Sequence, residues 1–213
     1  MGFISKKAIC AMFAIGFVTQ SVTAGTLDEW EKVQLPQRPE PEAVSVDPTK
    51  TALLMLDFNR PPCDPATRPR CAATIPAAQA LLEKAKAAGV YVIYTLGGGG
   101  TAADMDSRIQ PSGAEPTFTA PPNKFLGSDL ETLLKSRGIE TIIPMGAASN
   151  GSILYTSSEA AFRGYKVVVP VDGISAATVY AEQFTIWQLL NGPAVNNRVK
   201  LTRTDTIKFA PGN

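Results

Sequence analysis

Ser152 is the first candidate for a reactive position. An apolar run over residues 141–145 leads into a glycine, two alanines and the pair Ser149-Asn150, and small residues follow, which predicts a strand, a tight turn and a helix. Ligands of open α/β sheets bind where strands end and helices begin, because the first helical amides are unpaired and the helix dipole favours negative charge. Alternatively, Ser149 or Asn150 only caps the helix and Ser152 is a small residue of its first turn. Taken alone, the stretch favours this second interpretation.

Asp57 is the second candidate, because it lies near the end of a continuous apolar run. Residues 51–58, TALLMLDF, are apolar on both faces of a strand, as is typical of the centre of a parallel sheet. A carboxylate at the carboxyl end of such a strand is desolvated, so Asp57 needs a partner or a raised pKa. The alternative is a loop-capping aspartate that accepts hydrogen bonds from backbone amides.

The absence of histidine excludes several catalytic and metal-binding arrangements. With no histidine in the chain, Ser-His-Asp and Cys-His catalysis, HExxH zinc sites and histidine-based metal triads are ruled out. Residues 97–100 are glycines after a predicted strand, but they precede neither a Gly-Lys-Ser/Thr motif nor a helix, and no GxGxxG pattern is formed. We therefore expect no metal and no cofactor, and we interpret the glycines as a flexible loop or lid.

The charge balance argues against two classes of partner. The formal net charge is +1 and the basic residues form no cluster. Nucleic-acid-binding proteins and proteins that bind anionic membrane surfaces carry basic patches, so neither partner is expected.

The N-terminus predicts export. Lys6-Lys7, an apolar run over residues 8–18 and Val22-Thr23-Ala24 resemble a cleavable signal peptide over residues 1–24, which predicts a secreted or periplasmic protein without a membrane segment after cleavage. The alternative is an uncleaved N-terminal anchor. Residues 25–50 are rich in proline and charge and predict an extended arm, either packed across a neighbouring subunit or loose.

After signal cleavage, Cys63 and Cys71 are the remaining cysteines. In an exported protein such a close pair predicts a disulfide that closes its own loop and contributes about 2–3 kcal/mol to stability. Redox catalysis is the alternative, but the spacing is not CxxC.

Strands and helices alternate along the rest of the chain. This order predicts an α/β three-layer Rossmann-like fold, with a mostly parallel sheet of about six strands and helices on both faces. We expect the helix at 180–190 to bury Phe184, Trp187 and Leu190, and we interpret Lys124, in a loop before another helix, as a solvated surface charge. The predicted strands are residues 51–58, 90–96, 116–120, 141–145, 166–171 and 198–203, the last at an edge, and the predicted helices are residues 74–88, a helix capped by Ser128 and Glu131 that ends at Gly138, a helix that ends at Gly164, and residues 180–190.

Three segments together resemble a known family. LLMLDF, KFLGSDLETLL and GAASNGSILYTSSEAAFRGYKVVVPVDG are similar to the isochorismatase-like hydrolases, also called cysteine hydrolases, and the resemblance covers nearly all of residues 50–205 in order. It implies a hydrolase domain over residues 51–213 that acts on a small molecule without a metal. Members usually form dimers or tetramers, so a homo-oligomer is expected.

The resemblance also assigns roles to individual residues. It implies that Asp57 and Lys124 are the catalytic aspartate and lysine, and that Ser152 stands where amidase members have a nucleophilic cysteine. The Ala147–Ala148 peptide bond is implied to be cis, with backbone amides around Ala148 and Ser152 forming an oxyanion site.

Serine at position 152 leaves three interpretations. A thiol is partly ionised near neutral pH, whereas a hydroxyl needs a nearby base. In the first interpretation the protein cleaves a small organic acid, vinyl ether or amide without a covalent intermediate, Asp57 is the general acid/base and Lys124 orients it or binds a substrate carboxylate. The second is a serine amidase in which Asp57 or a neutral Lys124 activates Ser152. The third is a catalytically silent member that binds a small molecule.

Overall fold

The structure, a computed structural model, describes residues 25–211. The predicted signal peptide, residues 1–24, lies outside the described residues. The chain divides into two compact units, Met1–Arg38 and Pro39–Asn213. In the described part of the first unit, the short helix η1 (Trp30–Lys32) is the one regular element. The second unit begins earlier than the predicted domain at residue 51, because β1 (Val44–Val46) pairs in parallel with β9 (Ile207–Phe209).

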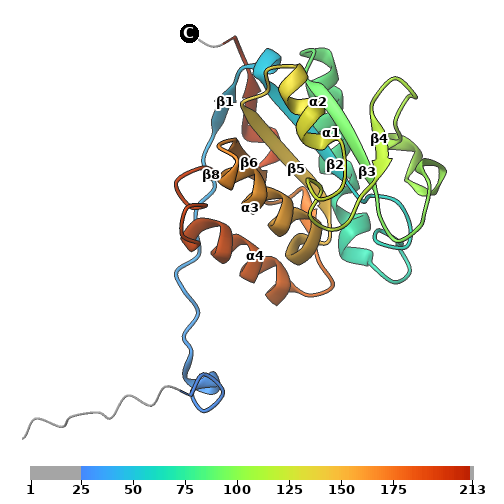
Figure 1. Cartoon of the computed structure of the whole chain (residues 1–213). Helices are drawn as coiled ribbons and strands as arrows, with labels where there is room; N and C mark the ends of the chain where they lie inside the picture. The colour runs from blue at the N-terminus through green and yellow to red at the C-terminus, as the bar shows by residue number, and fades with distance from the viewer. Residues whose placement is uncertain (1–24, 212–213) are drawn as a thin grey trace, which may run out of the picture. The chain divides into compact units, whose positions relative to one another are not determined.

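The second unit is built on a parallel sheet in the order β4-β3-β2-β5-β6-β8, with β7 paired to β5 off this path (Figure 1). All of its strand pairs are parallel. The predicted α/β fold with a mostly parallel sheet is therefore confirmed, and β8 is an edge strand as expected. The strands are β2 (Thr51–Leu56), β3 (Tyr91–Leu96), β4 (Thr117–Thr119), β5 (Thr141–Ala147), β6 (Lys166–Pro170), β7 (Ile174–Ser175) and β8 (Val199–Thr202).

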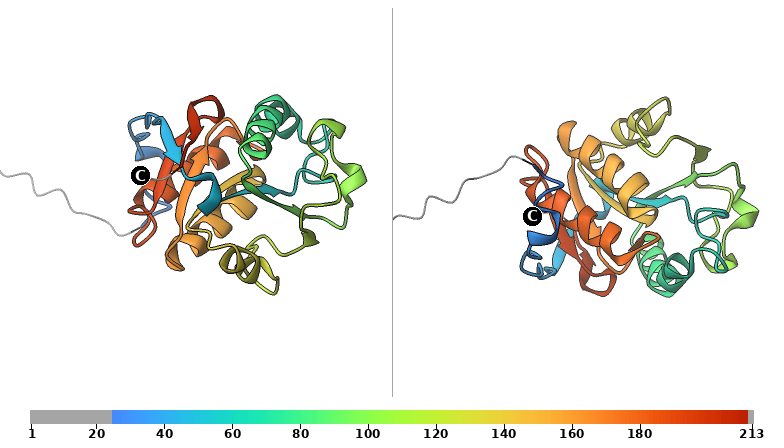
Figure 2. Two further views of the ribbon diagram at one scale, coloured as in Figure 1. Left: turned by 90° about the horizontal axis from the view of Figure 1, so that it is seen from above. Right: turned by 90° about the horizontal axis from the view of Figure 1, so that it is seen from below.

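Helices cover both faces of this sheet (Figure 2). Successive side chains of a strand point to opposite faces, so Leu53 and Met55 of β2 pack beneath α1, whereas Leu54 packs with the opposite layer. Helix α1 covers one face, and α2, α3 and α4 cover the other. The helices are α1 (Pro69–Ala87), α2 (Leu130–Ser136), α3 (Leu154–Phe162) and α4 (Val179–Asn191), and the short helical turns are η2 (Pro48–Lys50), η3 (Ala102–Asp104), η4 (Ser107–Ile109), the π-helical η5 (Ser149–Ile153) and η6 (Thr204–Thr206).

Two predicted helix starts were wrong. Helix α1 begins at Pro69 rather than at Thr74, because a proline at the first helical position needs no amide partner and has the helical φ. The predicted Ser128–Glu131 capping box is absent from α2. Ser128 Oγ instead accepts a hydrogen bond from the Leu130 amide at 3.2 Å, and the Glu131 side chain pairs with Lys135.

The predicted burial of α4 was wrong for Phe184 and Trp187, whereas Leu190 is partly buried and packs against the core. Phe184 and Trp187 are 42% and 46% exposed, whereas Thr185 and Leu189 face the core. Apolar residues occur around most of α4, so the 3.6-residue period did not identify the buried face.

Candidate functional site

Asp57 lies directly after the central strand β2, where its backbone has a positive φ of 54°. Its amide donates to the Thr95 carbonyl at 3.1 Å, and the Thr95 hydroxyl donates to Asp57 Oδ1 at 2.8 Å. Asp57 is 4% exposed. The neighbouring strand β3 therefore fixes both the backbone and one carboxylate oxygen of Asp57.

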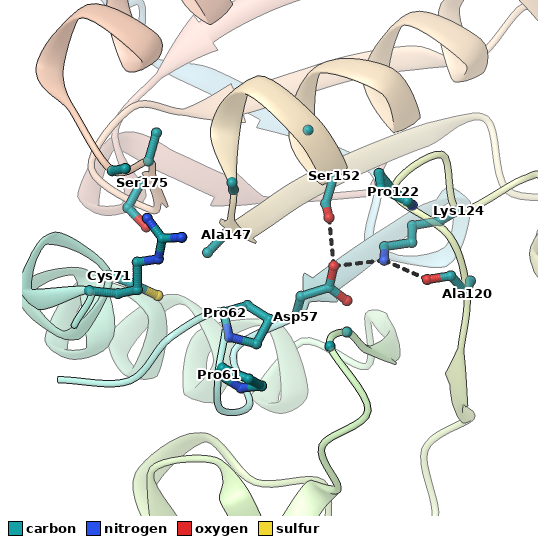
Figure 3. Close-up of a pocket in the computed structure, with 17 residues that line it drawn as sticks. Asp57, Pro61, Pro62, Cys71, Ala120, Pro122, Lys124, Ala147, Ser152 and Ser175 are labelled. Atoms are coloured by element: carbon teal, nitrogen blue, oxygen red, sulfur yellow. Dashed lines mark hydrogen bonds and ion pairs between the residues drawn. The ribbon is translucent and has the colours of Figure 1, made fainter. Parts of the chain in front are cut away.

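Lys124 and Ser152 both donate to the other carboxylate oxygen (Figure 3). Lys124 Nζ is 2.7 Å and Ser152 Oγ is 2.5 Å from Asp57 Oδ2. Lys124 Nζ also donates to the Ala120 carbonyl at 3.1 Å. The structure thus brings together the three residues that the resemblance implied, from segments far apart in the sequence.

The interpretation of Lys124 as a solvated surface charge was wrong, because the residue is 1% exposed. The loop that carries Lys124 is hydrogen-bonded to α3. The Lys124 amide donates to Thr156 Oγ1 at 3.1 Å, and the Thr156 hydroxyl donates to the Pro122 carbonyl at 3.2 Å. Within the same loop Ser128 Oγ donates to the Lys124 carbonyl.

Ser152 lies in the π-helical segment η5, between β5 and α3. The Ala147–Ala148 peptide bond that precedes η5 is cis, as the resemblance implied. Neither Ser149 nor Asn150 caps the helix: Ala148 is the N-cap of η5, and no side chain makes a cap hydrogen bond. π-Helical turns occur frequently at functional sites, and this one directs Ser152 to Asp57 rather than to the backbone.

These residues line a cavity of about 400 Å³. This volume suits a small molecule. Ala148 and Ser152, around which the resemblance implies an oxyanion site, belong to the wall, as does Ala147. The lining residues are Asp57, Pro61, Pro62, Arg68, Cys71, Gly97, Gly98, Ala120, Pro122, Lys124, Ala147, Ala148, Gly151, Ser152, Ser175, Ala176 and Ala177.

A disulfide-closed loop forms part of the cavity wall. Cys63 and Cys71 are disulfide-bonded, as predicted, with Cα atoms 5.3 Å apart. The loop they close contains Arg68, which sequence analysis did not identify as a site residue. The sequence nevertheless contained a signal that this loop lies near the site, because the loop follows closely after strand β2 and Asp57. Ser175 was also missed, since a two-residue strand such as β7 gives no periodic pattern.

The segment after β3, interpreted from its glycines as a flexible loop or lid, is anchored at both ends. The Gly97 amide donates to Asn59 Oδ1 at 3.0 Å, and Asn59 Nδ2 donates to the Gly97 carbonyl at 2.8 Å. Farther along, Glu115 pairs with Lys86 of α1 at 2.6 Å. Burial alone raises the pKa of Glu115, but hydrogen bonds from Lys86 and Ser112 lower it to about 2. Glu115 therefore keeps its charge, and this anchor, at neutral pH.

Residues 25–211 contain neither a cluster of metal ligands nor a helix that could span a membrane. This part of the chain holds no group of three or more histidine, cysteine, aspartate or glutamate side chains arranged to bind a metal ion. No helix in it has the length and apolar character needed to cross a membrane.

Comparison with known proteins gave a family match and similar structures. A family model described as "Isochorismatase domain" matches residues 51–197. N-carbamoylsarcosine amidase from Arthrobacter sp. is 28% identical over 90 residues, which cover 42% of this chain and 34% of the amidase. The match thus spans about a third of the length of that relative.

Two solved structures share the fold. An isochorismatase family protein from Desulfovibrio vulgaris is similar with a TM-score of 0.64 and 23% identity, covering 73% of this chain and 95% of that one. A cysteine hydrolase from Pseudomonas syringae is similar with a TM-score of 0.64 and 21% identity, covering 80% of this chain and 95% of that one.

The buried Asp57–Lys124 pair generates a stability prediction. We expect Lys124→Met or Asp57→Asn alone to lower the free energy of unfolding by about 3–5 kcal/mol, because each leaves a buried charge without its partner. The double variant removes both charges and should recover most of that loss. Urea denaturation of the wild type and the three variants at pH 7 gives the coupling energy directly. Strictly additive losses in the double variant would show that the two charges do not stabilise each other.

Proposed function

The chain belongs to the isochorismatase family of hydrolases, and on this premise we propose that it hydrolyses a small organic acid, vinyl ether or amide without a covalent intermediate. Asp57 is the general acid/base. The observation that carries this proposal is that Ser152 and Lys124 donate to the same oxygen of Asp57. A carboxylate held by two donors next to a small cavity is positioned to exchange a proton with a substrate or with water.

Among the described residues that line the cavity, none carries a free thiol to act as a nucleophile. Cys71 lines it, but its sulfur is bonded to Cys63. Lys124 is an unsuitable base, because its ammonium already donates to Asp57 and to the Ala120 carbonyl. Asp57 is thus the one carboxylate in the cavity wall and the group best placed to take a proton.

The proposed reaction uses water as the nucleophile. With an amide, Asp57 accepts a proton from the attacking water and returns it to the leaving nitrogen. With a vinyl ether, Asp57 delivers a proton to the carbon–carbon double bond, water adds to the resulting oxocarbenium ion, and a proton of that water restores the acid. The adduct then breaks its bond to the ether oxygen, which leaves as an alcohol, and a carbonyl compound remains. In both cases Lys124 holds the carboxylate in place, and Ser152 positions Asp57 or the water. The backbone around Ala147 and Ala148 faces the oxygen that gains negative charge.

A serine amidase is the second candidate function. It is favoured by the 2.5 Å contact in which Ser152 Oγ donates to Asp57 Oδ2, since a nucleophile and its base lie within hydrogen-bond distance of one another. In this alternative Asp57 takes the hydroxyl proton and passes it to the leaving amine as the C–N bond breaks, and Ser152 forms an ester with the substrate acyl group. Water then hydrolyses this ester, which releases the acid and returns the proton to Ser152. A catalytically silent protein that only binds a small molecule is the third candidate, because the cavity could hold a ligand even if neither reaction takes place.

We further propose that the protein is secreted or periplasmic. Residues 1–24 have the pattern of a signal peptide, and the Cys63–Cys71 disulfide suits an oxidising compartment.

Assembly as a homo-oligomer is also proposed, through a surface that we term the aromatic face: Tyr155, Phe162, Tyr180, Phe184 and Trp187. All five side chains are exposed, and they belong to α3 and α4, which contact one another. Aromatic residues are enriched in protein–protein interfaces. A second copy is the proposed occupant, because the family resemblance implies subunits that associate with themselves.

The water mechanism predicts unequal losses from two substitutions. Asp57→Asn should lower turnover by about 100-fold or more, since general acid–base catalysis contributes roughly 10²–10⁴-fold. Ser152→Ala should lower it by less than about 10-fold, the cost of one positioning hydrogen bond. Turnover is measured on a panel of amides, carbamoyl compounds and vinyl ethers. Ser157→Ala is the matched control, because Ser157 is a buried serine of α3 outside the cavity wall.

The outcomes separate the three candidates. If Ser152→Ala were as inactive as Asp57→Asn, and wild-type enzyme showed a burst of product, the serine amidase would replace the water mechanism. Full turnover by Asp57→Asn would refute both mechanisms. Ligand binding without turnover by the wild type would support the binding protein.

The proposed export predicts both the N-terminus and the disulfide state of the mature protein. Protein recovered from an oxidising compartment should begin at Gly25, and its intact mass should rise by about two hydrogens on reduction, since one disulfide yields two thiols. Two free thiols before reduction, or a retained Met1, would contradict the proposal.

If the aromatic face is the subunit interface, charged residues introduced into it should prevent the homo-oligomer from forming. The double substitution Phe184→Glu and Trp187→Glu should convert the oligomer to monomers in sedimentation velocity, because it places two charges in an apolar interface. Leu126→Glu, at an exposed apolar residue outside this face, is the control and should leave the oligomer intact. A monomeric wild type, or an oligomer that survives the double substitution, would refute the interface.

A further inference from the structure

The positive and negative charges of the side chains in the cavity wall do not cancel. Asp57 and Lys124 form a pair, which leaves Arg68 as a third, uncompensated charge in the wall. Among residues 25–211 the Arg68 guanidinium has no ion-pair or hydrogen-bond partner, whereas its backbone is held by the Asp64 carbonyl. An exposed arginine is ordinarily only solvated, so a second observation is needed to indicate a ligand.

Ser175 supplies that observation. It is 1% exposed and lines the cavity, yet its hydroxyl has no hydrogen-bond partner in the described part of the chain. A buried hydroxyl without a hydrogen-bond partner destabilises the protein. A ligand group that bonds to Ser175 would remove this destabilisation on binding.

The two residues lie away from the catalytic cluster. Ser175 is the register partner of Ala147 in β5, and in Figure 3 Ser175 and Cys71 are separated by Ala147 from the side where Ser152 and Lys124 lie. Arg68 belongs to the Cys71 side, because its carbonyl accepts a hydrogen bond from the Cys71 amide at 3.0 Å. The wall between the two ends consists largely of proline, glycine and alanine.

We propose that Arg68 and Ser175 form a carboxylate-binding subsite, so that the substrate is a small monocarboxylate whose scissile bond reaches Asp57. The guanidinium supplies charge and paired N–H donors, and the hydroxyl supplies a further donor, which together match a carboxylate. The disulfide between Cys63 and Cys71 limits the freedom of the loop that carries Arg68. This inference rests on the proposed function, because it names the substrate class of the same cavity.

Binding measurements test the subsite without requiring turnover. The probes are three carboxylates, acetate, propionate and benzoate, each compared by calorimetry with its neutral amide. Wild-type protein should bind each carboxylate at least about 10-fold more tightly than its amide, and Arg68→Gln should weaken carboxylate binding by about 10–100-fold and leave amide binding unchanged. Ser175→Ala should weaken carboxylate binding by a smaller factor, about 3–10-fold.

Two further variants keep the result unambiguous. Arg68→Lys should restore part of the preference, because it retains the charge but not the paired donors. Arg137→Gln, which removes an arginine outside the cavity wall, should change nothing. Circular dichroism confirms that each variant is folded.

Failure of the subsite is distinguishable from failure of the proposed reaction. Asp57→Asn should keep the carboxylate preference while it loses turnover. An Arg68→Gln protein with an undiminished preference would overturn the proposal and assign carboxylate binding to Lys124. Equal binding of acids and amides by the wild type would overturn it as well, whatever the turnover of Asp57→Asn.

Discussion

The buried pair of Asp57 and Lys124 is the constraint on which the site depends. Two charges removed from water are tolerated only where each finds a partner and the remaining donors and acceptors are bonded. Thr95 and Ser152 complete the bonds of the carboxylate, and the Ala120 carbonyl accepts from the ammonium. These groups come from β3, η5 and the loop before α2. The pair can form only when the central sheet and the layer of α2 and α3 are both assembled.

The hydroxyl of Ser152 makes the chemistry of this position depend on its neighbour. A thiol would be a nucleophile in its own right, whereas the hydroxyl donates a hydrogen bond to Asp57 and needs a base to become one. Asp57 consequently takes part in both mechanisms proposed above. Among the described residues of the cavity wall, the sulfur of Cys71 is held in a disulfide and is not a free thiol.

The order of elements and the position of Asp57 could be predicted from the sequence because they depend on local patterns. A short uninterrupted apolar run that follows a proline fits a strand covered on both faces, and the residue at its end then lies at the edge of the sheet where ligands bind. No local pattern in the sequence predicted the burial of Lys124, since this burial depends on a loop that is hydrogen-bonded to Thr156 of α3. Phe184 and Trp187 were misplaced because α4 is apolar around most of its surface. Arg68 and Ser175 could not be predicted as site residues. Arg68 lies in the loop closed by the disulfide and Ser175 lies in a two-residue strand, and neither segment shows a periodic pattern of apolar residues.

Strand β5 changes neighbour along its length, pairing with β6 at Thr141 and Ile142 and with β7 at Gly146 and Ala147. Ala147 and Ser175, which belong to this fork, represent a fixed half of the cavity wall that is held by strand pairing. Pro61, Arg68 and Gly98 represent a half formed by connecting loops. Side-chain replacements in the fixed half alter little of its outline, whereas loops tolerate insertion and exchange. Divergence among proteins with this sheet would then be concentrated in the loops around residues 61–70 and 98–116. The same scaffold could acquire new substrates there while the fork and the Asp57–Lys124 pair stay unaltered.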